Sequence, residues 1–268
     1  MPKIAILVEY DGEKFHGFQR QKSLVSVQQC IESALEIVLR EKITIEGAGR
    51  TDTGVHAKGM IISFYTSNLP QNFHRFIVSI NGLTNQAIVA LAAAEVNESF
   101  HARFSCTERE YEYYVLNTRF PHPLFSGRVY WEKCKLNLEI IKNEIKSLIG
   151  KHDFTSLTNK SYNPKESTER EIKNAEVIEI PEVNGLFKIQ IRSNGFLYNM
   201  VRVIAGTLID IGKGVLETRN MEEIIRSKNR KQAGITLPPT GLYFLRAYYK
   251  DYPEISDLYN KSWSVPVI

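Results

Sequence analysis

The chain is poor in cysteine and has no long apolar run. Its three cysteines, Cys30, Cys106 and Cys134, are odd in number and far apart, which excludes a chain-wide disulfide framework and fits no zinc-ligand spacing. We therefore expect a reducing, cytoplasmic setting. No run of about 18 apolar residues occurs, so we expect no membrane-spanning helix. Residues 1–6 enter a strand-like pattern directly, without the cleavage region of a signal peptide.

Motifs for bound nucleotides and metals are missing as well. The sequence holds neither Gly-x-Gly-x-x-Gly nor a Walker A loop, and no His-Glu-x-x-His, so nothing indicates a nucleotide cofactor or a metal. Gly-x-Ser-x-Gly, the signature of a serine nucleophile elbow, is absent too. The six aspartates are scattered and do not supply the cluster that a metal-dependent nucleoside hydrolase would need. We expect no cofactor and no metal.

What is present is an ordinary globular composition. Of the 268 residues, 43% are hydrophobic and 24% are charged, which is close to the average of soluble domains. At roughly 150 residues per domain, this length predicts two domains or one large one. The net charge of +4 permits binding to nucleic acid, but so small an excess does not by itself indicate it.

Strand-like and helical patterns alternate along the chain. Apolar runs and period-two alternation predict strands at residues 3–10, 43–45, 60–65, 87–91, 111–116, 171–180, 186–192 and 242–249. Helical periodicity predicts helices at residues 27–38, 70–80, 138–148, 196–211 and 218–225, the first capped by Ser26 and the last by Thr218. This order predicts an α+β fold of two halves, with helices covering one face of a mixed sheet. Pro121 and Pro123 interrupt the pattern, so we place the halves at residues 1–117 and 118–268.

The most informative stretch is the glycine-rich segment of residues 47–57. Three glycines within eight residues let the backbone turn tightly and approach a ligand. Asp52 stands there beside Arg50. In one interpretation Asp52 caps a helix and pairs with Arg50; in the other it is a lone catalytic carboxylate with an arginine nearby. A single carboxylate would exclude ordinary glycosidase chemistry, which needs two.

Two further segments combine unusual residues. If residues 109–114 form a strand, Arg109, Tyr111 and Tyr113 share one face. A tyrosine there either packs across the sheet or stacks on a nucleic-acid base. Arg202 falls within an apolar helical pattern, where an arginine is rare unless it is paired or reaches solvent. Asp52 is our candidate partner for Arg202. The basic run of residues 226–231 is either a solvated helix end or a phosphate contact.

At these residues the chain resembles the TruA-type tRNA pseudouridine synthases. Residues 49–56, Gly-Arg-Thr-Asp-Thr-Gly-Val-His, are similar to the signature loop of that family. Other motifs match the family in the same order: Tyr10-Asp11-Gly12, Gly17-Phe18-Gln19, Phe100-His101-Ala102-Arg103-Phe104, Arg109-x-Tyr111-x-Tyr113, Asn194-Gly195-Phe196-Leu197, Met200-Val201-Arg202 and Gly241-Leu242-Tyr243. The ordered set runs from residue 10 to 243, so the resemblance covers essentially the whole chain.

The resemblance implies a fold and a function. Family members convert uridine to pseudouridine at nucleotides 38, 39 and 40 in the anticodon stem-loop of tRNA, without a cofactor or metal. Their fold, the pseudouridine synthase fold, consists of two similar α/β halves joined through a mixed, mainly antiparallel sheet. They are homodimers, and one tRNA touches both subunits. We therefore expect a cytoplasmic homodimeric isomerase whose partner is the anticodon arm of tRNA.

The resemblance also assigns roles to four residues. Asp52 corresponds to the catalytic aspartate, which attacks the base, attacks the sugar or assists elimination; the sequence does not choose among these. Tyr111 corresponds to the tyrosine that stacks on the target base, and Arg202 to the arginine that pairs with the aspartate. Arg50 would fill the space that the target uridine leaves in the RNA when it is extruded, a movement that costs a few kcal/mol.

The chain departs from the family pattern at three places. Thr53 replaces the alanine that is most common after the aspartate, and Asn199 stands where histidine is frequent. Residues 81–86 lack the usual proline and aspartate of the local loop.

Three other functions remain open. They are an isomerase for other RNA positions, an RNA-binding module or chaperone that has lost catalysis, and a nucleoside hydrolase that uses Asp52. The presence of Asp52, Tyr111 and Arg202 together argues against the second, and the missing aspartate cluster argues against the third.

Overall fold

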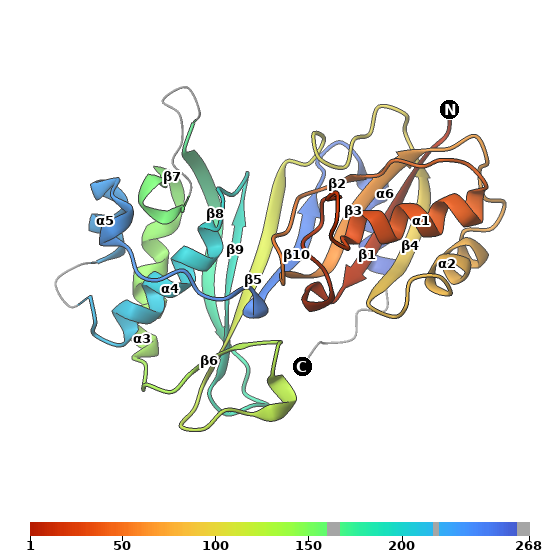
Figure 1. Cartoon of the computed structure of the whole chain (residues 1–268). Coiled ribbons are helices and arrows are strands. Elements are labelled where there is room, and N and C mark those ends of the chain that lie inside the picture. The colour runs from red at the N-terminus through yellow and green to blue at the C-terminus, as the bar shows by residue number, and fades with distance from the viewer. Residues whose placement is uncertain (160–166, 217–219, 262–268) are drawn as a thin grey trace. The chain divides into compact units, whose positions relative to one another are not determined.

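The chain forms two compact units in a computed structural model that describes residues 1–159, 167–216 and 220–261 (Figure 1). The first unit comprises Met1–Arg109 together with the chain from Tyr243 onward, and the second comprises Glu110–Leu242. This division differs from the expected halves, 1–117 and 118–268. The reason is that the last strand returns to the first unit, where Tyr243 and Phe244 pair in parallel with His56 and Ala57.

The first unit is a mixed sheet with helices. Its elements are β1 (Lys3–Tyr10), η1 (Gly12–Lys14), α1 (Val27–Leu39), β2 (Glu46–Gly47), β3 (His56–Tyr65), α2 (Phe73–Asn81), β4 (Ile88–Val96), β10 (Leu242–Tyr248) and α6 (Pro253–Lys261). The strand order is β4-β1-β3-β10, with β2 paired to β3. β1 runs antiparallel to both of its neighbours, whereas β10 runs parallel to β3. The end of β1 therefore lies beside the start of β3, with Tyr10 opposite Ala57.

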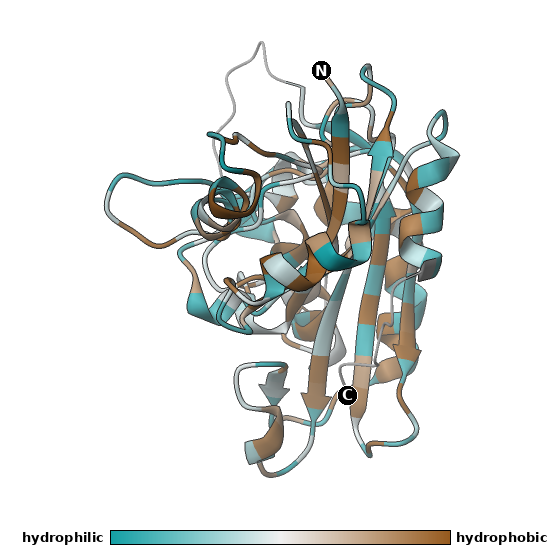
Figure 2. Cartoon of the chain, turned by 90° about the vertical axis from the view of Figure 1, so that its right-hand side faces the viewer, coloured by the Kyte–Doolittle hydropathy of each residue, from teal (hydrophilic) through white to brown (hydrophobic). Residues whose placement is uncertain are grey.

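Burial explains why β1 occupies a central position. Residues on both of its faces, such as Ile4 and Ala5, are fully buried, and such burial is typical of a strand covered on two sides. α1 begins where the sequence predicts, because the Ser26 hydroxyl accepts a hydrogen bond from the Gln29 N–H at 3.3 Å. Figure 1 shows α1 crossing the strands of this unit. In Figure 2 several strands carry hydrophobic bands interrupted by hydrophilic ones.

The second unit contains a second set of strands and helices. Its elements are β5 (Glu108–Asn117), η2 (Pro123–Phe125), β6 (Tyr130–Glu132), α3 (Leu138–Glu144), η3 (Ile145–Leu148), β7 (Gly150–Asp153), η4 (Thr155–Leu157), β8 (Glu169–Glu179), β9 (Leu186–Ser193), α4 (Met200–Gly212), α5 (Met221–Ser227), η5 (Arg230–Gln232) and η6 (Pro239–Gly241). The strand order is β5-β9-β8-β7, with β6 parallel to β5. Strands mixed with helices in both units confirm the α+β class.

Three sequence predictions need correction. Residues 43–45 form no strand: Ile43 and Ile45 are buried, but the strand in this stretch is β2 at Glu46–Gly47. α4 begins at Met200 and not at residue 196, because Asn199 takes a left-handed conformation with φ of 58° and ends the preceding turn. The expected cap Thr218 lies outside the described residues; α5 starts at Met221 and is capped by Asn220.

Two negative findings hold for the described part of the chain. None of its helices has the length and apolar character that a membrane crossing requires. Within the same residues, no three side chains of His, Cys, Asp or Glu gather in a way that could hold a metal ion.

Candidate active site

Asp52 lies in the first unit, on the loop that connects β2 to β3. It is half-buried, and the neighbouring Arg50 is exposed. The Val55 N–H donates a hydrogen bond to the Asp52 carbonyl oxygen at 3.1 Å, and Gly54 adopts a positive φ of 80°. The loop therefore closes in a tight turn and passes directly into β3 at His56. Of the two interpretations of the sequence, the helix cap is wrong, because the turn leads into a strand.

Two glycines of the opening motif hold the Asp52 loop. A Cβ atom at Gly12 would lie 2.0 Å from the Val55 carbonyl oxygen, a distance that no side chain tolerates. Gly17, at a φ of +89°, leaves only 3.0 Å between such an atom and the Thr51 carbonyl oxygen. Only glycine permits both the positive φ and the close backbone approach. The two glycines of the motif are therefore required by their packing against the Asp52 loop, a reason that the sequence alone does not reveal.

Hydrogen bonds complete this attachment. The Tyr10 hydroxyl and Thr51 Oγ1 are 2.7 Å apart and hydrogen-bonded, with both groups buried. The Phe18 N–H donates to the Thr51 carbonyl oxygen at 3.0 Å. Residues 10–18 and the Asp52 loop, far apart in sequence, therefore form one packed structure.

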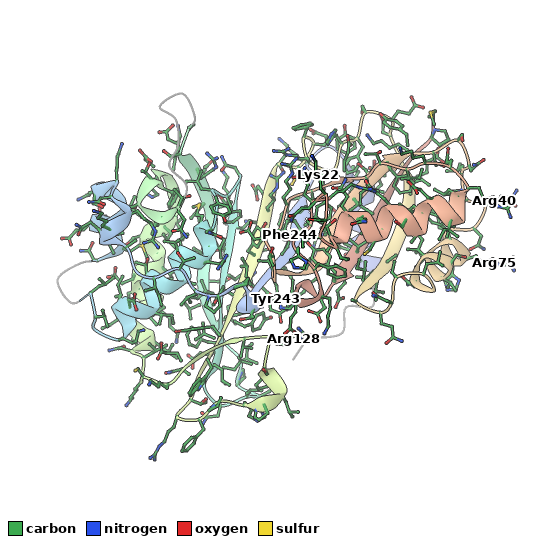
Figure 3. The ribbon with its side chains drawn as sticks, viewed as in Figure 1. Lys22, Arg40, Arg75, Arg128, Tyr243 and Phe244 are labelled. Atoms are coloured by element: carbon green, nitrogen blue, oxygen red, sulfur yellow. The ribbon has the colours of Figure 1, made fainter. Side chains whose placement is uncertain are left out.

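His56 anchors the far end of the loop. Its imidazole is buried, and its Nδ1 accepts a hydrogen bond from the Gly12 N–H at 3.1 Å. The ring also stacks on Tyr243, with centroids 4.7 Å apart and an interplanar angle of 22°. Figure 3 labels Tyr243 and Phe244 on β10. The returning strand therefore supports the loop that carries Asp52.

Tyr111 lies on β5 in the second unit. Only 9% of its surface is exposed, and its ring meets the Phe196 ring edge-on, with centroids 4.9 Å apart. Tyr113, two residues on, is fully buried and donates its hydroxyl to the Pro238 carbonyl oxygen at 2.8 Å. Burial raises the pKa of Tyr113 well above its ordinary value. Tyr113 is thus a packing residue, as one sequence interpretation holds, whereas Phe196 fixes the orientation of the Tyr111 ring.

Arg202 lies in the first turn of α4, in the same unit as Tyr111. It is half-buried, its Nε donates to the Leu237 carbonyl oxygen at 2.7 Å, and its Nη1 donates to Asn199 Oδ1 at 2.8 Å. α4 passes close to the chain before Leu237, because a Cβ atom at Gly206 would lie 1.9 Å from the Ile235 carbonyl oxygen. Asn199, a departure from the motif that the sequence resembles, therefore holds the guanidinium of Arg202.

The basic run of residues 226–231 is largely engaged within the protein. Arg226 forms an ion pair with Glu222, and the Lys228 ammonium lies 2.9 Å from Asp153 Oδ2. Arg230 donates to the Gly234 carbonyl oxygen at 2.8 Å. These contacts favour a structural role over the phosphate contact that the sequence left open.

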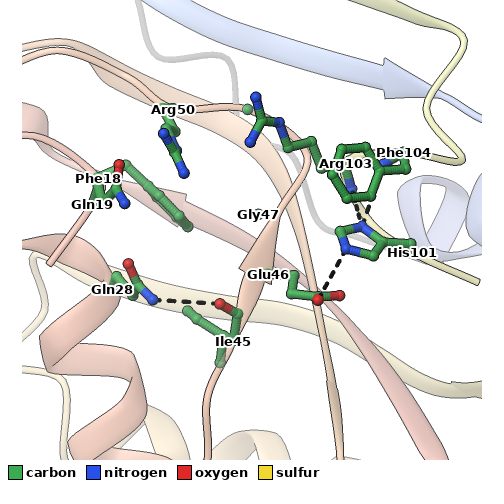
Figure 4. Close-up of a pocket in the computed structure, with 11 residues that line it drawn as sticks. Phe18, Gln19, Gln28, Ile45, Glu46, Gly47, Arg50, His101, Arg103 and Phe104 are labelled. Carbon is green, nitrogen blue, oxygen red and sulfur yellow. Dashed lines mark hydrogen bonds and ion pairs between the residues drawn. The ribbon is translucent and has the colours of Figure 1, made fainter.

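Some cations of the first unit lie far from one another. Figure 3 shows Lys22 well apart from Arg40 and Arg75, which lie near the ends of α1 and α2. These three cations therefore do not form one basic patch. Arg50, by contrast, lines a pocket with a volume of about 220 Å³ (Figure 4).

Comparison with known proteins identifies the family. A sequence model described as "tRNA pseudouridine synthase" matches residues 6–105 and 145–250. The curated protein "tRNA pseudouridine synthase A" of Leptospira biflexa is 47% identical over 262 residues, covering 97% of this chain and 98% of that protein. Proteins of the same name from Thermoanaerobacter sp. and Nitrosococcus oceani are 38% and 37% identical, covering 93% and 99% of this chain and 100% and 99% of theirs.

Proposed function

This chain belongs to the tRNA pseudouridine synthase family, and from that premise we propose that it isomerises uridine to pseudouridine at positions 38, 39 and 40 in the anticodon arm of tRNA. Enzymes of this family are isomerases that act on tRNA uridine. The proposal adds the positions in the RNA and a single catalytic aspartate, Asp52. The observation that supports it best is the Asp52 loop itself, whose backbone is held by Gly12 and Gly17.

The isomerisation breaks one bond and forms another within the same nucleotide. The N1–C1′ glycosidic bond breaks, the base turns, and a C5–C1′ bond forms; the proton on C5 leaves to water and N1 gains one. No atom or electron is supplied from outside, so the chemistry requires no oxidant or reductant. In our proposal the Asp52 carboxylate acts as the nucleophile that assists the break, at the base or at the sugar.

A carboxylate can act in this way only while it is ionised. In our proposal the guanidinium of Arg202 pairs with Asp52, because a positive charge beside a carboxylate favours its ionised form. A planar guanidinium also fixes the orientation of the carboxylate when two hydrogen bonds form. Support comes from the way Asn199 and Leu237 hold the Arg202 side chain in place.

Tyr111 and Arg50 contact the RNA in this proposal. Tyr111 stacks on the target base, and Phe196 orients its ring for that purpose. Arg50, exposed beside Asp52, fills the space that the extruded uridine leaves. Extrusion costs a few kcal/mol and is least costly at the edge of a loop, where positions 38 to 40 lie. We further propose that the enzyme works as a cytoplasmic homodimer.

Release of tritium tests the reaction. A tRNA transcript carrying uridine labelled at C5 loses the label to water when C5 joins the sugar. We expect release with the wild-type protein and none with Asp52→Ala, although the variant still binds tRNA, because phosphate contacts carry most of the affinity. Loss of activity and of binding together would instead make Asp52 structural. Tight binding without any release by the wild type would favour an RNA-binding protein or an isomerase for another RNA.

A further inference from the structure

The mechanism above assigns no ligand to the pocket that Arg50 lines. This pocket lies within the first unit, between Phe18, the start of α1, β2 and the turn of residues 101–105 (Figure 4). Its volume is about 220 Å³, smaller than the roughly 300–1,000 Å³ typical of pockets for drug-sized ligands. The space therefore suits a single small planar group.

The rim of this pocket carries an exposed aromatic ring and a cation. Phe104 is 75% exposed, and the Arg103 guanidinium lies 5.5 Å from the centroid of its ring. Arg50 and Phe18 line the other side of the pocket, across Gly47 (Figure 4). The Phe104 ring also contacts the His101 ring, with centroids 4.3 Å apart. Most of its surface nevertheless stays in water and forgoes the stabilisation that burial would give it.

The turn that presents Phe104 is held by an ordered polar network. Nδ1 of His101 accepts the backbone N–H of Arg103 at 3.1 Å and that of Phe104 at 3.3 Å. These bonds place the ring proton on Nε2, which lies 2.9 Å from Glu46 Oε1. The other oxygen of Glu46 lies 3.7 Å from the buried ammonium of Lys3. The backbone that carries the exposed pair is therefore fixed from β1 and β2.

The same turn is tied to the chain that leads to Asp52. Arg109 donates from Nε to the Ala48 carbonyl oxygen at 2.8 Å and from Nη2 to the Arg103 carbonyl oxygen at 2.9 Å. One guanidinium thus joins the turn of residues 101–105 to the strand end that precedes the Asp52 loop. The two rims of the pocket are held at a fixed spacing.

We propose that this pocket binds one unstacked nucleotide of the RNA substrate, other than the uridine that is isomerised. The base stacks on Phe104, and the adjoining phosphate contacts the guanidinium group of Arg103. Exposed aromatic rings beside cations are what single-stranded nucleic acid requires, since every base offers a flat face and every linkage an anion. The inference rests on the proposed function for its ligand, RNA.

The second unit offers a matched control for this pair. Phe120 is 71% exposed, and the Arg119 guanidinium lies 5.2 Å from its ring. Arg119 and Phe120 match the chemistry and exposure of Arg103 and Phe104, but they do not line this pocket. Substitutions at the two pairs therefore separate a located subsite from general attraction between RNA and exposed arginine–aromatic pairs.

Affinity for tRNA is the first measurement. We expect Phe104→Ala to weaken binding of a full tRNA transcript about 5- to 150-fold, the change that corresponds to one stacked base at about 1–3 kcal/mol. Phe104→Tyr should bind like the wild type, because a tyrosine ring stacks equally well, and Phe120→Ala should change little. Equal losses with Phe104→Ala and Phe120→Ala, or none with Phe104→Ala, would overturn the proposal. Thermal unfolding confirms that each variant is folded.

The salt dependence of binding tests the phosphate contact. Each neutralised phosphate contributes about 0.7–0.9 to the slope of log affinity against log salt. We expect Arg103→Ala to reduce the slope by about that amount and Arg119→Ala to leave it unchanged. An unchanged slope for Arg103→Ala would contradict the proposed contact between Arg103 and a phosphate.

Photocrosslinking identifies the nucleotide. Transcripts carrying one 5-iodouridine at each single-stranded position in turn are irradiated with the wild-type protein, and the adducts are mapped by mass spectrometry. We expect a crosslink to Phe104 from a nucleotide that the enzyme does not isomerise. Crosslinks confined to residues other than Phe104 would contradict the proposal, even if those residues line the pocket.

Tritium release by the wild type separates the two proposals. If the wild type isomerises tRNA and Phe104→Ala binds and reacts like it, the subsite is wrong and the function stands. If the wild type releases no tritium while Phe104 still governs binding and crosslinks, the subsite stands and the proposed reaction is wrong.

Discussion

The Asp52 loop and the start of α4 hold their functional residues in different ways. Asp52 sits on a loop whose course depends on distant glycines, because Gly12 and Gly17 leave room for its backbone and for nothing larger. Arg202 sits on a helix, whose own hydrogen bonds fix the backbone, and here Asn199 and Leu237 hold the guanidinium itself. The loop is therefore sensitive to added atoms, whereas the helix is sensitive to lost hydrogen-bond partners.

The largest effect within this comparison is expected at Arg202. Arg202→Lys keeps the charge but loses the planar fork that bonds Leu237 and Asn199, and the two residues are not interchangeable in such a site. We expect a loss of about 10²- to 10³-fold in kcat, the size seen when one electrostatic donor is removed from an active site. Single-turnover tritium release measures it.

Asn199→Gly is the graded control for that substitution. Glycine accepts the positive φ of this position, so the variant removes only the amide that holds the guanidinium. We expect a smaller loss, about 10-fold, with tRNA affinity unchanged. If Asn199→Gly and Arg202→Lys lowered kcat by the same factor, the effect of the arginine would depend on its bond to Asn199 and not on contact with Asp52.

The loop side of the comparison is tested at Gly12. Gly12→Ala places a methyl group within 2.0 Å of the Val55 carbonyl oxygen, so the loop must shift. A displacement of about 1 Å can cost about 10²-fold in rate, and overpacking of this kind costs about 1–3 kcal/mol of stability. The rate is measured by tritium release and the stability by urea unfolding.

Gly82→Ala is the matched control. Gly82 follows α2 with an ordinary φ of −66°, and an added Cβ atom would have its nearest neighbour at 3.5 Å. Its activity and stability should stay near those of the wild type. A Gly12→Ala variant that behaved in the same way would refute the idea that backbone packing positions Asp52.

Tyr111 tests whether stacking is the role of the ring. Tyr111→Phe keeps the ring and its edge-on contact with Phe196, whereas Tyr111→Ala removes both. We expect the alanine variant to lose about 5- to 150-fold in kcat/KM, since stacking on one base contributes about 1–3 kcal/mol, and the phenylalanine variant to lose less. Equal losses in the two variants would contradict stacking.

The smallest effect concerns the acid sensitivity of the second unit. Burial alone would raise the pKa of Asp153, but hydrogen bonds from Thr155, Thr168 and Lys228 outweigh it and hold the pKa well below the ordinary value of 3.8. A carboxylate with a lowered pKa stabilises the fold above its unfolded pKa and loses that contribution as the pH falls. Asp153→Asn should therefore be less stable than the wild type at pH 7, with the difference shrinking toward pH 3. Urea midpoints at the two pH values measure this, and a constant difference would contradict it.

The sequence predicted the α+β class and most elements, because their periodicity and caps are local. The Ser26 cap of α1 is an example. It did not predict the division into units, since the parallel pairing of β10 with β3 joins residues nearly 190 positions apart and leaves no local pattern.

The candidate site was predicted only in part. The sequence singled out the loop that carries Arg50 and Asp52. The need for glycine at Gly12 and Gly17 comes from tertiary contacts with this loop, which composition does not reveal. The chemistry assigned to Asp52, Tyr111, Arg202 and Arg50 came from the family resemblance, and these roles remain predictions. The sequence indicates no role for His101 beyond its place in a motif. Its bonds to Arg103, Phe104 and Glu46 depend on a turn that only the fold defines.

The most direct test of the account pairs two transcripts with two proteins. One tRNA transcript has uridine at position 39 but not at 38 or 40, and that uridine is labelled with tritium at C5. The other has no uridine at positions 38 to 40 and carries labelled uridine at other positions. The account predicts release from the first transcript with the wild type, no release with Asp52→Ala, and no release from the second transcript with either protein. Release from the second transcript, or from the first with Asp52→Ala, would contradict it.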